Sequence, residues 1–382
     1  DLEKMNEKQK KKAHLSLETT EAMSFGSGFI SGTLSSILGI FGLGIVLSLR
    51  FPNYFTTEEL TDFYSSISIL RAAIHVILIS SFVLGCISTI LRANKALGLT
   101  GITCTLIAAL LGGSQVEIGG EIGERSAFGL DYFVLSLIMY SAVFIPLERL
   151  WALRPEQAVF RREWHVDLTY FFMNSILVEV LTFFTLQPSF ILFDWARIAS
   201  LVVILGSLPL IIQVPILLIV ADFAQYWIHR TFHAIPFLWH FHAIHHSSEE
   251  MDWLAGSRLH LIDVMVTRGF TYIPIYCLGF SETAIFVYVF LVAIQATFIH
   301  ANVRWEFKSV QSWIATPAFH HWHHGAEPEA IDKNFSVHTP IWDRIFGTYY
   351  MPGRWPKAYG LAGDHKLPSN WLTQLIYPFM KK

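Results

Sequence analysis

Histidine is the residue type whose number and spacing stand out in this chain. There are 17 histidines among 382 residues, and most of them lie in three short runs, HRTFH at 229–233, HAIHH at 242–246 and HHWHH at 320–324. Neutral imidazole is the commonest protein ligand for iron, zinc and copper, and many imidazoles gathered together have little other chemical use. The three runs therefore predict a metal site.

The spacing within the runs favours two metal ions. Residues three and four apart on a helix share one face, about 5 to 6 Å apart at Cβ. His229 and His233 have this spacing, and in each of the other runs the first histidine precedes an adjacent pair by three and four residues. Each run can therefore direct several imidazoles at one point. A structural zinc is closed by four ligands, so eight imidazoles indicate a binuclear site. The eight are His229, His233, His242, His245, His246, His320, His323 and His324, whereas His240 and His321 fall outside the repeated spacing and are expected not to bind metal.

The composition predicts an all-α integral membrane protein. Hydrophobic residues make up 53% of the chain and charged residues only 15%, with a mean hydropathy of +0.45, which is too apolar for a soluble domain of this length. A net charge of -3 offers no basic surface, which excludes a nucleic-acid partner. The three cysteines lie in apolar runs without metal-ligand spacing, so neither a disulfide framework nor thiolate chemistry is indicated.

About eight apolar segments are long enough to be predicted as transmembrane helices. The long stretch before the sixth contains Pro209 and Pro215, so a separate interfacial helix is expected to precede that crossing. A polar tail at 1–24, a four-helix membrane bundle at 25–147 and a catalytic region at 148–382 are the expected divisions. The predicted spans cover 25–49, 67–91, 97–112, 129–147, 168–186, a stretch ending in 211–228, 264–280 and 284–299.

The charges of the loops predict the orientation. The lysine-rich tail, the pair Arg92 and Lys95, and the arginines within 149–162 alternate along the chain with acidic loops at 58–62 and 117–124. Basic loops favour the cytoplasmic side, which places the N-terminus and all three histidine runs there. Residues 301–382 are then expected to form a cytoplasmic, histidine-rich helical cap with the loop 229–263. Such a site fits a bacterial inner membrane and the endoplasmic reticulum equally.

The ligand type and its setting favour oxidation of a lipid. Nitrogen-rich shells suit iron, copper or zinc better than magnesium or calcium. Oxygen activation at reduced iron can break an unactivated C–H bond, whereas zinc has no redox chemistry. Two alternatives stay open: a zinc-dependent membrane hydrolase, although its usual HExxH signature is absent, and a non-catalytic metal transporter, although that requires polar residues near the middle of the membrane.

The three runs resemble the HxxxH, HxxHH and HxxHH signature of the fatty acid hydroxylase and sterol desaturase superfamily, which comprises membrane non-haem di-iron enzymes. The resemblance covers roughly 163–350 and is closest to the alkylglycerol monooxygenases and bacterial sterol-desaturase-like proteins, while the N-terminal bundle lies outside it. The positions that extend it beyond the histidine runs are Asp222, Tyr226, 247–249, Arg258, 300–302, 316–317, 332–335, 342–343 and 346–348.

The resemblance implies that the eight histidines are iron ligands and that His300 is a ninth. Asp222 lies two helical turns before His229, so its carboxylate is expected to orient a ligating imidazole through the other ring nitrogen. Asn302, Asn334 and Asp332 are weaker candidates for the same supporting role, with helix capping and turn formation as the alternative. Ligation by His260 and His338 stays open.

The sequence therefore predicts a membrane di-iron oxygenase that uses O2 to hydroxylate or desaturate a C–H bond of an ether lipid, a sterol or a fatty acyl chain. Its expected cofactors are two iron ions. The sequence contains no dinucleotide or haem-attachment motif, so an external reductant is expected: a cytochrome, a ferredoxin, a flavoprotein or a pterin. Neither the oligomeric state nor the role of 1–147 is indicated.

Overall fold

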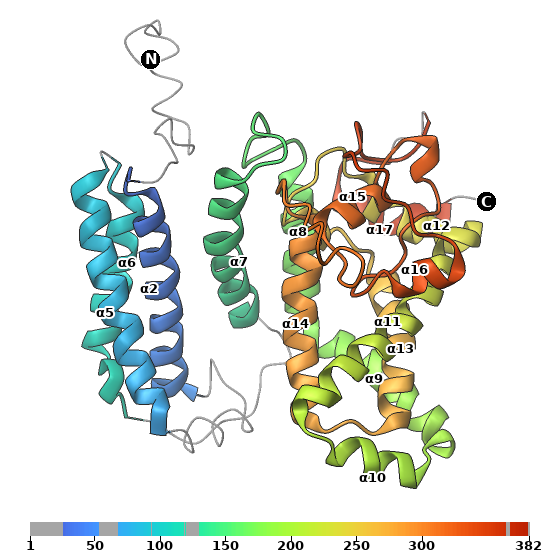
Figure 1. Ribbon diagram of the computed structural model, residues 1–382, viewed down its shortest axis with the longest axis horizontal. Coiled ribbons are helices and arrows are strands. Elements are labelled where there is room, and N and C mark those ends of the chain that lie inside the picture. Colours follow the sequence, from blue (N-terminus) through green and yellow to red (C-terminus); the bar gives the residue numbers. More distant parts are fainter. Residues whose placement is uncertain are drawn as a thin grey trace, which may run out of the picture. The chain divides into compact units, whose positions relative to one another are not determined.

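The chain is described by a computed structural model over residues 26–52, 68–92, 94–117, 119, 130–363 and 367–380. Within these residues the structure is helical and contains no strand, only two isolated β-bridges. It divides into two compact units, the first comprising Asp1–Arg125 with Val134–Leu150 and the second Ser126–Phe133 with Trp151–Lys382 (Figure 1). The expected polar tail at 1–24 lies outside the described residues, as do the acidic loop residues 58–62 and 121–124.

Six of the described helices are long and apolar enough to cross a membrane. A bent pair, Phe183–Ala196 with Ala199–Ser207 at 119°, makes a seventh if it forms one span. The prediction of an all-α, multi-pass membrane protein is confirmed, and the number eight is approximate. The six are α2 (Phe29–Arg50), α5 (Ser68–Leu91), α6 (Ala96–Leu110), α11 (Leu210–Ala234), α13 (Leu261–Leu278) and α14 (Glu282–His300).

The fourth and fifth predicted spans differ from these six. Helix α7 (Leu130–Leu150) covers the fourth but is not among them. The fifth is not one continuous helix: α8 (Trp164–Ile176) ends at Leu177, whose φ of -94° and ψ of 11° are not helical, and α9 (Val178–Phe193) begins there. Apolar composition alone does not mark such a break.

The separate helix expected before the sixth crossing is present as α10 (Ala199–Ser207), at the lower end of the second unit in Figure 1. It ends at Leu208, which has an extended ψ of 149°, and Pro209 follows. The proline ring disfavours a helical conformation in the preceding residue, which explains this boundary. Pro215, by contrast, lies within α11.

The three spans of the first unit pack through small residues. A Cβ on Gly39 of α2 would lie 2.7 Å from the carbonyl oxygen of Gly101 on α6, so only glycine permits this approach. Ser35 of α2 and Ser81 of α5 donate hydrogen bonds to each other's backbone carbonyls, at 2.7 and 2.8 Å. Small and hydroxyl-bearing residues are typical of helix interfaces in membranes.

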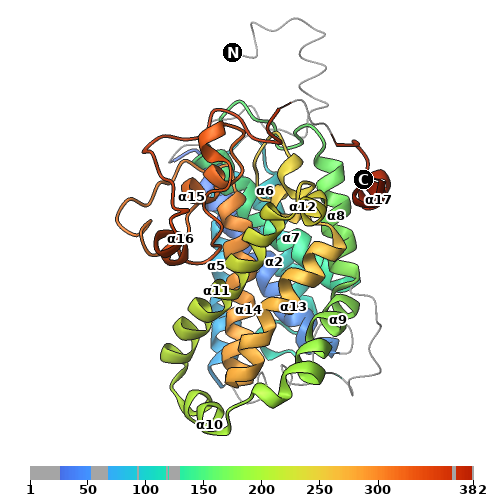
Figure 2. The ribbon, with the colours of Figure 1, turned by 90° about the vertical axis from the view of Figure 1, so that its right-hand side faces the viewer.

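The spans of the second unit form a frame for a set of shorter helices. Leu217 and Ala221 of α11 pack with Ile275 of α13 and with Ala284 and Tyr288 of α14 in one buried cluster. Figures 1 and 2 both show the short helices at one end of this frame. They are α12 (Pro236–His242), α15 (Pro317–His323), α16 (Ile341–Phe346) and α17 (Trp371–Met380). The histidine runs lie at this end.

Candidate metal centre

The structure brings all nine predicted histidines together, in two groups. In each group one ring nitrogen from every member lies within 4.8 Å of those of the others. The contributing elements are the last turns of α11 and α14, α12 with the 3-10 turn η4 (His245–Ser247) that follows it, and α15. The first group is His229, His233, His242, His246 and His323, and the second is His245, His300, His320 and His324.

The runs are not each aimed at a single point, which corrects the expectation from spacing. Within a run, histidines four residues apart share a group, whereas the histidine that follows the first by three residues joins the other group. Neighbouring residues point about 100° apart around a helix. The adjacent rings of His245 and His246 also lie in different planes, inclined at 85°, and those of His323 and His324 at 86°. Each adjacent pair therefore supplies one imidazole to each group.

Backbone carbonyls determine which ring nitrogen is free in several of these histidines. The Nδ1 atom of His229 lies 2.7 Å from the carbonyl oxygen of Phe335, and that of His323 lies 2.8 Å from the carbonyl of Lys333. In the second group, Nδ1 of His300 lies 2.6 Å from a carbonyl of its own helix. A carbonyl can only accept, so Nδ1 carries the hydrogen and Nε2 keeps a lone pair.

These lone pairs face one another across short distances. His245 also donates from Nδ1, to the carbonyl of Arg258 at 3.2 Å, and its Nε2 lies 3.2 Å from Nε2 of His300. Two acceptors cannot form a hydrogen bond with each other. Further ring nitrogens of the two groups are buried without a partner in the described part of the chain, namely Nε2 of His233, His246 and His323 and Nδ1 of His320 and His324. Each such atom costs about 1 to 3 kcal/mol unless it is satisfied, so the donor set fits bound cations.

Protonation does not compete with metal at the histidines of the loops and short helices. Burial, and then the like charge of neighbouring imidazoles, lowers their pKa values well below the usual range. They are neutral at physiological pH, which is the form that binds metal. This holds for His242, His245, His246, His320, His323 and His324.

Two carboxylates lie behind imidazoles of the first group. Oδ2 of Asp263 lies 2.7 Å from Nδ1 of His242, and Oδ1 of Asp332 lies 3.3 Å from Nδ1 of His233. The hydrogen bond with His233 lowers the pKa of Asp332. Sequence analysis missed Asp263, although it is the single acidic residue in the apolar run Leu261–Leu278. An isolated carboxylate in an apolar run was the feature of the sequence that could have identified it.

Three of the four polar residues expected to support the ligands are placed elsewhere, and the fourth, Asp332, is the one that contacts His233. Asp222 accepts hydrogen bonds from the backbone N–H groups of residues 337–339, at 2.8 to 3.0 Å, instead of one from an imidazole. Asn302 exchanges two hydrogen bonds with the backbone of Arg154. Asn334, with φ of +57°, bonds to the backbone of Phe319 and Tyr350. All three stabilise loops, in agreement with the alternative of turn formation.

The remaining buried histidines lie outside both groups. His321 contacts the hydroxyl of Tyr359 at 2.8 Å, and His338 contacts Oε1 of Gln295 at 3.0 Å. His260 caps α13 by accepting a hydrogen bond from the N–H of Ile262. Their polar contacts are therefore with ordinary protein groups.

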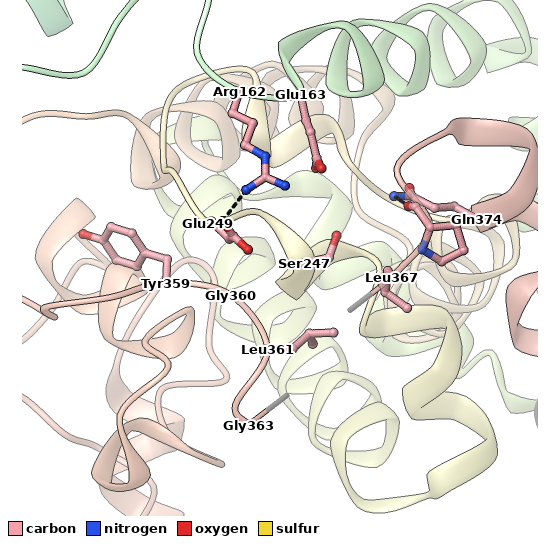
Figure 3. A pocket seen from close by; sticks show the side chains of 11 residues that line it. Arg162, Glu163, Ser247, Glu249, Tyr359, Gly360, Leu361, Gly363, Leu367 and Gln374 are labelled. Atoms are coloured by element: carbon pink, nitrogen blue, oxygen red, sulfur yellow. Dashed lines mark hydrogen bonds and ion pairs between the residues drawn. The ribbon is translucent and has the colours of Figure 1, made fainter. Parts of the chain in front are cut away.

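A polar cavity of about 160 Å³ opens beside the second histidine run (Figure 3). Ser247, which directly follows His246, lies in its wall with Glu163. Arg162 and Glu249 form an ion pair of 3.2 Å across its edge, marked by the dashed line in Figure 3. None of the nine histidines lines this cavity.

The apolar helices and the two imidazole groups define a multi-pass membrane protein with a histidine-rich candidate metal centre. The fatty acid hydroxylase family matches residues 214–348, which include all nine histidines. An ornithine lipid hydroxylase of Rhizobium tropici is 31% identical over 175 residues, which are 46% of this chain and 52% of the relative. Alkylglycerol monooxygenase of Homo sapiens is 30% identical over 148 residues, which are 37% of this chain and 31% of the relative.

The match to this family agrees with the resemblance that the histidine motifs indicated. The alkylglycerol monooxygenase of Xenopus tropicalis is 31% identical over 141 residues. The chain thus covers about half of the bacterial relative and about a third of the vertebrate ones. No solved structure was found to match it.

Proposed function

We propose that this protein is a membrane lipid hydroxylase in which the two histidine groups hold two iron ions. The observation that carries the proposal is the convergence of nine imidazoles, with their free nitrogens facing one another, at one end of a frame of apolar helices. Such a nitrogen-rich shell suits iron. Bound iron would supply the oxygen activation that insertion into an unactivated C–H bond requires.

The reaction proposed is hydroxylation of a lipid. A substrate C–H bond, one O2 molecule, two electrons and two protons give a C–OH group and water. The relatives are named for ornithine lipid and alkylglycerol, both of which combine an apolar chain with a polar headgroup. A related lipid of this kind is the proposed substrate class, with desaturation as the other possible outcome at the same carbon.

The electrons would come from an external donor, either a cytochrome, a ferredoxin, a flavoprotein or a pterin. The loop charges support a cytoplasmic position for the histidine end, where such donors are found. The division into a membrane bundle at 25–147 and a catalytic region at 148–382 belongs to the same proposal.

The protein's own residues would have three tasks in this reaction. The carbonyls of Lys333, Phe335 and Arg258 fix the tautomers of three imidazoles, so that the free nitrogens face inward. Burial keeps the histidines of the loops neutral. The burial of the imidazoles would also limit access of water, which protects a reactive oxidant from unproductive reduction.

The zinc hydrolase alternative is less well supported. A hydrolase needs a carboxylate base facing the metal-bound water. In the described residues both groups contain histidine alone, while Asp263 and Asp332 lie behind imidazoles, on their Nδ1 sides. A metal transporter would need ligands within the spans, whereas these histidines lie at helix ends and in loops.

The test combines metal analysis with product analysis on the full chain, expressed with iron and purified in detergent without oxygen. We expect close to two irons per chain, and incorporation of labelled O2 into a membrane lipid when a reductant is added. His323→Ala and His245→Ala, one from each group, should lose iron and product. His240→Ala is the matched control, because His240 lies beside the second run but in neither group. Full activity in both group variants would contradict the proposal.

A further inference from the structure

The two histidine groups differ in what lies behind their imidazoles. In the first group, Asp263 and Asp332 contact Nδ1 of His242 and His233. In the second group, the described partners of Nδ1 are the uncharged carbonyls of Ala296 and Arg258. The negative charge that supports the ligands is therefore on one side of the centre.

Of the two carboxylates, Asp263 is the one whose negative charge acts more strongly on its imidazole, because it is less exposed to solvent. It is only 3% exposed, and its second oxygen accepts a hydrogen bond from Thr267 at 3.0 Å. Within the described part of the chain no Lys or Arg forms an ion pair with it, so a cation on the other side of the His242 ring would serve as its counter-charge. Asp332, whose side chain is 64% exposed, is screened by solvent.

A buried carboxylate without a counter-charge is unfavourable. A metal ion at Nε2 of His242 would balance that charge through the ring. In return, the carboxylate makes the imidazole a stronger electron donor and fixes its orientation, and removing such a partner typically weakens metal binding by about 10-fold to 100-fold. The hydrogen bond between Asp263 and His242 therefore destabilises the metal-free protein and stabilises the metal-loaded one.

We propose that Asp263 is a positioning residue that acts through His242 and makes the two metal positions unequal, so that the first group holds its ion more tightly than the second. The proposal rests on the proposed function, since it concerns the same centre. A stronger donor set also stabilises the higher oxidation state, so the first position would be the more easily oxidised of the two.

The experiment follows iron per chain as a chelator is added to the full-length protein in detergent. For the unsubstituted protein we expect two steps, with one iron removed well before the other. Asp263→Asn keeps the shape of the side chain and an oxygen that accepts from Nδ1, but removes the charge. This variant should lower the chelator concentration needed for the later step by about 10-fold to 100-fold, toward the concentration of the earlier step.

Asp332→Asn is the matched control, because it removes a carboxylate from the same group at an exposed position. We expect its shift to be less than about threefold, as for other solvent-screened charges. Mössbauer spectra of the iron-loaded protein should contain two distinct signals that become more alike in Asp263→Asn and stay distinct in Asp332→Asn.

Thermal unfolding of the metal-free protein separates positioning from a general structural role. If Asp263 mainly serves the metal, Asp263→Asn should leave the metal-free protein as stable as before or make it more stable, while lowering the stability of the loaded protein. Equal losses in both forms would overturn the proposal.

A single release step for two irons, unchanged in Asp263→Asn, would also overturn it while leaving the proposed function intact. Absence of bound iron in the unsubstituted protein would instead contradict the proposed function itself. The two failures are therefore distinguishable.

Discussion

The two histidine groups are supported by loop segments that are stabilised in opposite ways. Residues 332–339 lie behind the first group and supply the carbonyls of Lys333 and Phe335 to its imidazoles. This segment is held by anions: the carboxylates of Asp222 and Asp343 accept five of its backbone N–H groups. No Lys or Arg pairs with either carboxylate in the described residues.

Residues 252–258 lie behind the second group, and they are held by a network in which two arginines pair with three carboxylates. Arg161 bonds to Asp252 at 2.7 Å and to Asp167 at 2.6 Å, and Arg258 bonds to Asp167 from its other side. The carbonyl of Arg258 accepts from His245. Because each arginine pairs with two acids and Asp167 pairs with both arginines, loss of one group leaves most of the others with a partner.

The comparison indicates that the first segment depends on single carboxylates, whereas the second shares its stabilisation among several ion pairs. Substitutions in the first should therefore cost more and remove a different metal ion from those in the second. The following predictions test this difference, beginning with the largest expected effect.

Asp343→Ala should have the largest effect. Its oxygens accept the N–H groups of Phe335 and Ser336 at 2.8 and 2.9 Å and the hydroxyl of Thr348 at 2.6 Å. Removing a buried acceptor leaves these donors unsatisfied, at an expected cost of about 3 to 5 kcal/mol of unfolding free energy. Iron of the first group should be lost. Thermal unfolding and iron content measure both effects.

The control for this variant is Asp343→Asn, which retains one acceptor oxygen and should fall between the alanine variant and the unsubstituted protein. Loss of the second iron alone in Asp343→Ala would contradict the assignment of this segment to the first group.

Arg258→Met should cost less and act on the other group. It removes one cation from Asp167, which keeps its bond to Arg161, so we expect about 2 to 3 kcal/mol of destabilisation instead of the full cost of a broken buried pair. The iron held with His245 should be lost first in a chelator titration. Arg162→Met is the matched control, because Arg162 is exposed and its ion pair with Glu249 should contribute little.

Much of the centre could be predicted because histidine spacing is readable from the sequence. Pairs such as His229 and His233, or His320 and His324, are four residues apart, and each pair shares a group. The split of the second and third runs between two groups was not predictable, because it depends on the rotational position of each helix relative to the others. The spacing alone does not specify that position.

The supporting atoms were the least predictable part. The carbonyls of Lys333 and Phe335 belong to the backbone, so no residue type marks them. Asp222 has the correct spacing to lie under His229, yet it is engaged by the backbone of 337–339. For the fold, Pro209 marked the end of α10, whereas no residue type marked the break at Leu177.

The third prediction is that lowering the pH destabilises the first segment, which contains His338, more than the second. Burial lowers the pKa of His338, in the first segment, to about 4, while Arg258 stays charged because Asp167 outweighs the effect of burial and raises its pKa. A histidine with a lowered folded pKa contributes stability above its unfolded pKa, near 6.5, and this contribution is lost as pH falls toward 4.

For His338 this amounts to about 2 kcal/mol at pH 5 relative to pH 7.5. His338→Gln should therefore flatten the dependence of unfolding free energy on pH between these values, measured with denaturant. An unchanged pH profile in this variant would mean that another group is responsible for the acid sensitivity.

Gly256→Ala should have the smallest effect on stability and a specific effect on the second group. A Cβ at this position would lie 2.9 Å from Nδ1 and 3.1 Å from Cγ of His300, so the ring must move by a few tenths of an ångström. Such overpacking costs about 1 to 2 kcal/mol. The displaced ring should weaken the second iron and leave the first in place. Gly269→Ala, whose Cβ would meet only a carbonyl oxygen at 3.8 Å, should change neither iron content nor release. If Gly256→Ala instead released the first iron, residues 252–258 would support both groups and the contrast between the segments would fail.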